Sequence, residues 1–147
     1  MSTNFWKVPA WELPMDRVAQ VELLRLHNSD FISEDGWPAS FWHYVQGRRS
    51  LNGDKAQHII QLFQGLSLGE PARCHIPKWG LAFFDKERLL FTTTLCFECS
   101  NVYVYTACGK ELRAFDASEL HAKKLLVLLK QELPLQSTSM DCKVSNT

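Results

Sequence analysis

The sequence lacks a charge surplus, a membrane-length apolar run and a secretory signal. Lysine plus arginine equals aspartate plus glutamate, at 16 each in 147 residues. Without a basic surplus to neutralise phosphates, no nucleic-acid partner is expected. No apolar run reaches the roughly 18–20 residues of a membrane span, so no membrane association is expected either. The N-terminus has no charged region followed by an apolar one, which predicts a cytoplasmic protein.

A disulfide framework is not expected from the cysteine content. Five cysteines, an odd number, fit free thiols or metal ligands better in a reducing compartment. A domain of this length buries about 68–70% of the surface that its unfolded chain exposes, so it folds without a metal or a disulfide. A zinc site would therefore be an addition to the fold, and no cofactor is required.

Turn signals and hydrophobic periodicity predict a single α+β domain over residues 16–135. Prolines and tryptophans in residues 1–15 indicate an extended arm, and the small polar residues 136–147 indicate a disordered tail. Alternating apolar residues within 16–28 favour a strand over a helix. The aromatic run 41–45 predicts a second strand after the turn at Gly36-Trp37-Pro38.

Two helices and a four-strand antiparallel meander complete the predicted fold. Apolar residues at helical spacing predict one helix from Asn52 or Asp54 and another that begins with a capping box formed by Asp116 and Glu119. Short turns between β-prone runs predict strands at 80–85, 89–97, 101–107 and 111–115. With the N-terminal strands they form an antiparallel sheet packed with two helices.

The spacing of Cys96 and Cys99, with two residues between them, is typical of half a zinc site. Antiparallel pairing of strands 80–85 and 89–97 brings both thiols toward Cys74, and His75 is the nearest fourth ligand. Cys108 lies at the opposite end of the strand 101–107. A second C-x2-C pair, which a standard structural site would show, is not in the sequence.

Two other interpretations of the cysteines stay open. Thiol–disulfide exchange is one, but redox pairs usually open a helix, and the negative charge of Glu98 between the thiols disfavours the thiolate form that exchange requires. Packing as small buried hydrophobes is the other, and the aromatic and β-branched surroundings favour it.

The segment from Cys74 to Val104 resembles a recurring segment of small uncharacterised bacterial proteins. The resemblance rests on Cys, a Pro three residues on, a Gly before a short strand and a Cys-aromatic-x-Cys end, here Cys74, Pro77, Gly80, Cys96, Phe97 and Cys99. It implies a bacterial cytosolic origin and no particular chemistry. The chain departs from the group at Lys78-Trp79, where an Arg-His pair is frequent.

Acidic and aromatic residues gather in the first quarter of the chain. A solvated loop with a few anchoring rings is one interpretation, and a protein interface is the other, since aromatic residues supply contact energy and acids steer a basic partner. The sequence has no nucleophile elbow, His-Glu-x-x-His or phosphate loop. The leading hypothesis is thus a non-enzymatic protein-binding protein, in particular an immunity protein that neutralises a bacterial toxin. Its predicted contact residues are Trp6, Trp11, Asp30, Phe31, Glu34, Asp35 and Trp37.

Overall fold

A computed structural model describes residues 13–27, 32–70 and 74–134. Within them, six antiparallel strands form one sheet in the order β2-β1-β3-β4-β5-β6, which confirms the α+β fold with an antiparallel sheet. The strands are β1 (Gln20–Leu26), β2 (Val45–Asn52), β3 (Trp79–Phe84), β4 (Leu89–Cys96), β5 (Asn101–Thr106) and β6 (Gly109–Ala114).

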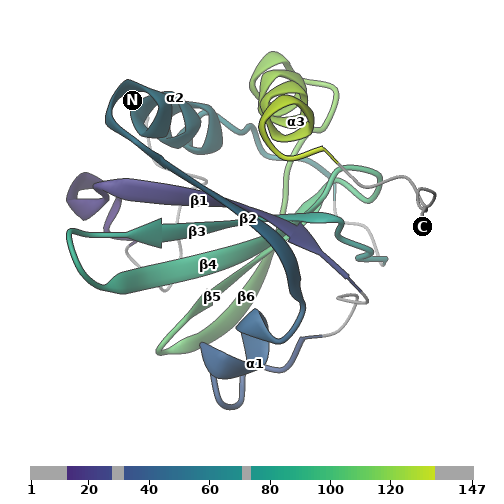
Figure 1. The fold of residues 1–147 in the computed structure, drawn as a ribbon. Coiled ribbons are helices and arrows are strands. Elements are labelled where there is room, and N and C mark those ends of the chain that lie inside the picture. The colour runs from purple at the N-terminus through teal and green to yellow at the C-terminus, as the bar shows by residue number, and fades with distance from the viewer. Residues whose placement is uncertain (1–12, 28–31, 71–73, 135–147) are drawn as a thin grey trace, which may run out of the picture.

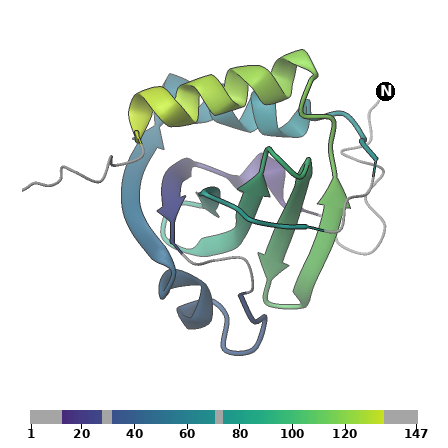
Figure 2. The ribbon, with the colours of Figure 1, turned by 90° about the vertical axis from the view of Figure 1, so that its right-hand side faces the viewer.

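Two long helices, α2 (Gly53–Gln64) and α3 (Leu120–Glu132), cover one face of the sheet. Figures 1 and 2 show them side by side across this face, with the short helix α1 (Ala39–Trp42) beyond the opposite face. No helix among the described residues has the length and apolar content to span a membrane.

The main core lies between the sheet and the two long helices. Side chains alternate between the two faces of a strand, so every second residue of β3, β4 and β5 points toward α2 and α3. Phe83 is fully buried there, stacks on Phe91 at 4.4 Å between ring centroids, and contacts Phe63 of α2 at 5.1 Å. This aromatic stack joins the helix layer to the centre of the sheet.

A second, smaller core covers the opposite face. Phe41 of α1 is fully buried and meets the Tyr105 ring edge-on at 5.4 Å. Leu24, Leu26 and Ala82 complete this cluster from the sheet side. Both faces of the sheet are therefore packed.

Two local predictions were wrong. The first residues of the predicted strand 41–45 lie in α1, because burial of Phe41 against the sheet outweighs the β-propensity of the run. The second helix has Glu119, not Asp116, at its N-cap, where the Glu119 carboxylate accepts from the His121 backbone N–H. Asp116 instead accepts from Ser118 in the preceding turn.

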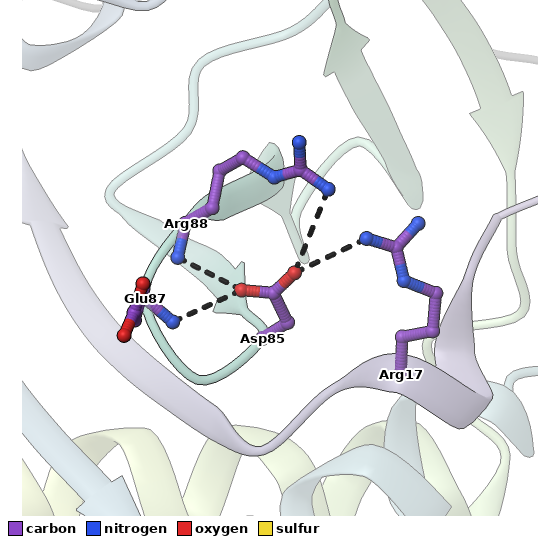
Figure 3. A network of polar contacts seen from close by, with 4 residues as sticks. All are labelled: Arg17, Asp85, Glu87 and Arg88. Atoms are coloured by element: carbon purple, nitrogen blue, oxygen red, sulfur yellow. Dashed lines mark hydrogen bonds and ion pairs between the residues drawn. The ribbon is translucent and has the colours of Figure 1, made fainter.

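The β3–β4 turn is stabilised by Asp85 (Figure 3). Its carboxylate accepts from the backbone N–H groups of Glu87 and Arg88 at 3.0 and 2.8 Å, and from the Arg17 guanidinium at 3.1 Å. These bonds, those to the two backbone N–H groups foremost, lower the pKa of Asp85. Arg17 belongs to the short helix Met15–Arg17, so Asp85 joins the start of the described domain to this hairpin.

We expect Phe83→Ala to destabilise the protein by about 3–5 kcal/mol, because it removes a fully buried ring and leaves a cavity between sheet and helix. Urea unfolding at neutral pH measures the loss. Val127→Ala on the exposed side of α3 is the matched control and should change stability by less than about 0.5 kcal/mol. A similar loss in both variants would contradict the central place of the Phe83 stack.

Candidate functional site

The structure joins Cys74 to Cys99 in a disulfide at the end of the sheet where β4 turns into β5. Antiparallel pairing of β3 and β4 brings the two cysteines together, as the sequence predicted, but the preference for free thiols was wrong for this pair. Cys96 stays a buried free thiol, and its sulfur accepts from the Cys99 backbone N–H at 3.2 Å. Cys108 is an exposed thiol in the distant β5–β6 turn.

His75 and Asn101 form a polar network beside the disulfide. The Asn101 side-chain amide donates to the Cys74 carbonyl at 2.7 Å, which fixes the amide orientation and turns its oxygen toward His75. His75 Nδ1 lies 2.5 Å from that oxygen and Nε2 lies 2.7 Å from the Thr94 hydroxyl. A neutral ring with its proton on Nδ1 satisfies both contacts, since Nδ1–H donates to Asn101 and Nε2 accepts from Thr94.

Burial keeps this imidazole neutral. It lowers the pKa of His75 below its usual value, and the Lys110 ammonium acts in the same direction, while the hydrogen bond to Asn101 opposes them. The edge of the ring packs on Tyr103 at 4.7 Å between centroids. Both nitrogens are engaged, so the ring serves to hold the segment after Cys74 onto the sheet.

The predicted zinc ligands Cys74, Cys96, Cys99 and His75 lie at the same end of the sheet. The disulfide uses two of the three sulfurs, and both His75 nitrogens have protein partners. Over the described ranges, no group of three or more histidine, cysteine or acidic side chains is arranged to hold a metal ion. Zinc binding stays a prediction that would require reduction of the disulfide, because zinc takes thiolate ligands.

The other residues on which the resemblance to bacterial proteins rests have packing roles in the fold. Pro77 is buried, and Phe97 meets Phe115 edge-on at 5.6 Å. A Cβ at Gly80 would lie 2.5 Å from the Thr93 carbonyl oxygen, so only glycine fits between β3 and β4 there. The spacing of the cysteines, the proline and the glycine along this segment is therefore explained by two paired strands that a disulfide joins.

A second site is the acidic loop, residues 32–38, at the other end of β5. Glu34 and Asp35 are exposed and Trp37 is half-buried. With the turn at residues 106–109 they line an open cleft of about 350 Å³. The predicted contact residues Trp6, Trp11, Asp30 and Phe31 lie outside the described residues.

The acidic loop is tied to the sheet by hydrogen bonds. Trp37 Nε1 donates to the Thr92 hydroxyl at 3.0 Å, and the Lys110 backbone N–H donates to the Glu34 carboxylate at 2.8 Å. The Ile32 carbonyl accepts from the Lys110 ammonium at 2.9 Å and from the Tyr105 hydroxyl at 3.3 Å.

Three residues of these sites were not predicted from the sequence: Asn101, Thr94 and Lys110. Each belongs to a strand that reads as ordinary alternation, and its partners lie 19 to 78 positions away in the chain. A buried asparagine in a β-prone run was the one available signal, because asparagine is depleted in strands.

The fold and these sites define a small two-layer α+β protein with a disulfide at one end of the sheet and an acidic loop at the other. Comparison with protein-family models, curated proteins and solved structures gave no match to the chain. The resemblance to small bacterial proteins therefore stays a prediction.

Reduction of the disulfide should destabilise the protein by roughly 3 kcal/mol, because the bond closes a loop between residues 25 positions apart. Urea unfolding with and without a reductant measures this. The Cys74→Ser/Cys99→Ser variant should be less stable and insensitive to the reductant, whereas Cys108→Ser should behave like the parent protein. Equal stability of the parent protein in both conditions would contradict the structural role of the bond.

The His75 contribution to stability should depend on pH. The ring titrates near 6.5 in the unfolded chain and below that in the folded protein, so the unfolded state takes up the proton first as the pH falls. The stability difference between the parent protein and His75→Gln should be full above pH 7 and shrink as the pH falls below 6.5. Urea unfolding across this range tests it, with exposed His58→Gln as control, and a constant difference would count against a buried neutral ring.

Proposed function

We propose that the chain is a non-enzymatic protein-binding protein that uses the acidic loop, residues 32–38, as its contact surface. The observation that supports this is the combination of exposed carboxylates at Glu34 and Asp35 with a backbone held to the sheet. A loop that is already ordered loses little conformational entropy when a partner binds, which improves affinity.

The composition of the surface suggests the chemistry of the partner. Two exposed carboxylates and a half-buried tryptophan line the same cleft. Carboxylates steer a basic surface toward this cleft, and tryptophan is enriched among residues that dominate binding energy. The partner that fits best has a basic contact face.

More specifically, we propose that the chain is a bacterial immunity protein that acts in the cytoplasm and neutralises a cognate toxin. The small size, the balanced net charge and the local acidic surface support this by analogy with such proteins. Zinc-stabilised and thiol-redox functions are the alternatives, and the disulfide beside a free thiol favours the second of these.

The direct test is co-expression of the chain with each protein encoded next to it, followed by isothermal titration and stopped-flow association. We expect one stable complex whose association slows by about tenfold in the Glu34→Gln/Asp35→Asn variant at low salt. Glutamine at position 34 can still accept the Lys110 hydrogen bond, so the loop should keep its conformation.

Asp54→Asn/Glu87→Gln removes two exposed acids elsewhere on the surface and is the matched control for charge. It should leave the association rate unchanged. Absence of a stable complex with any neighbouring gene product would remove the main support for the proposal. A complex that both double variants weaken equally would place the contact surface away from the acidic loop.

A further inference from the structure

Three sulfur atoms lie at the end of the sheet where β4 turns into β5. Cys74 and Cys99 are bonded to each other, and Cys96 is a free thiol. The Cys96 sulfur is 3.2 Å from the Cys99 backbone nitrogen. It therefore lies on the same turn, residues 97–100, that carries the Cys99 side chain.

The three cysteines differ in their access to solvent. Cys96 is 1% exposed and Cys99 is 4% exposed, whereas Cys74 is exposed. Cys74 is therefore the residue of the three that is accessible from solution, while Cys96 is buried. This arrangement places a buried thiol on the same turn as the buried cysteine of the bond and leaves the other bonded cysteine exposed.

We propose that Cys96 is an internal exchange thiol that frees Cys74 to form a mixed disulfide with a cationic disulfide substrate. The Cys96 thiolate attacks the Cys99 sulfur, the Cys96–Cys99 bond forms, and the Cys74–Cys99 bond breaks. The electron pair leaves on Cys74, and the proton released by Cys96 goes to solvent. The step has no net oxidation and needs no external oxidant.

The second step couples Cys74 to the substrate. The Cys74 thiolate attacks one sulfur of a substrate disulfide, forms a Cys74–substrate disulfide and releases the other half as a thiol. The protein then carries one substrate fragment at Cys74 and a Cys96–Cys99 disulfide. The number of sulfur–sulfur bonds is the same before and after this step, so it requires no oxidant or reductant.

The segment that carries Cys74 stays attached to the sheet without its disulfide. The Asn101 amide still donates to the Cys74 carbonyl, and His75 still bonds Asn101 and Thr94. Because these contacts do not involve sulfur, the exchange leaves the Cys74 thiol at its place on the surface rather than releasing the segment.

The surroundings of Cys74 select for positive charge. Cys74 and Cys99 line an open cleft of about 610 Å³, and the charged side chains among its described lining residues are Glu70, Glu98 and Asp116, of which Glu98 also pairs with Lys78 at 3.6 Å. A cleft lined by one sign of charge raises the local concentration of ions of the opposite sign. The expected substrate class is therefore a disulfide that carries ammonium or guanidinium groups, such as a cystine within a basic peptide.

The test uses the full chain with Cys108→Ser and Cys142→Ser, so that only the three clustered cysteines remain. The protein is incubated with cystamine, a disulfide with two ammonium groups, then acid-quenched, alkylated and mapped by mass spectrometry. We expect one cysteamine on Cys74 together with a Cys96–Cys99 disulfide. An adduct on Cys96 with Cys74–Cys99 intact, or no adduct in the folded protein, would overturn the proposal.

Adding Cys96→Ala to this background removes the internal thiol. This variant should retain the Cys74–Cys99 disulfide and form no adduct, and circular dichroism checks that it is folded. An adduct on Cys74 in this variant would show direct attack from solution and overturn the role of Cys96. If the variant does not fold, the positions of the adduct and of the disulfide in the protein that retains Cys74, Cys96 and Cys99 decide whether the proposal holds.

A separate measurement tests the preference for a cationic disulfide over an anionic one. The rate of adduct formation with cystamine is divided by the rate with dianionic 3,3′-dithiodipropionate, which cancels general changes in thiol reactivity. Glu70→Gln/Glu98→Gln should lower this ratio by roughly tenfold at low ionic strength, and Asp54→Asn/Glu87→Gln should leave it unchanged. An unchanged ratio in the first variant would overturn the proposed substrate class.

Discussion

The packing of α2 and α3 on one face of the sheet is the constraint on which both candidate sites depend. Burial of Phe83, Phe91 and Val104 beneath these helices fixes the register of β3, β4 and β5. Because strand side chains alternate, the same register turns Thr94 and Tyr105 to the opposite face. A slip of one residue would exchange these two sets, so the polar network is a consequence of the apolar core.

The sequence was sufficient for the parts of the fold that depend on periodicity. The strands from Trp79 to Ala114 and the helix Gly53–Gln64 follow from alternation and helical spacing within single segments. The α1 residues could not be found in this way, because Phe41 is buried against Tyr105 and its neighbours, which come from distant strands. Local propensity contains no information about such a contact.

The candidate sites were less predictable from the sequence than the strands and helices were. Hairpin geometry alone brought Cys74 and Cys99 to the same end of the sheet. The choice between thiol, metal ligand and disulfide depends on the distance between the two backbones, here 5.8 Å between Cα atoms, which a sequence does not specify. The bonds of Asn101 depend in the same way on the placement of the Cys74 carbonyl across the sheet.

The two candidate sites share one face of the sheet but lie at its opposite ends. β5 begins at Asn101 beside the disulfide and ends at Thr106 beside the acidic loop, a span of roughly 17 Å. The Tyr103 ring lies between them, with the His75 ring packed edge-on and the Lys110 ammonium 4.7 Å from its centroid. Lys110 also bonds Ile32 and lowers the pKa of His75. Lys110 therefore contacts both candidate sites, through its hydrogen bond to the acidic loop at one end and its charge near His75 at the other.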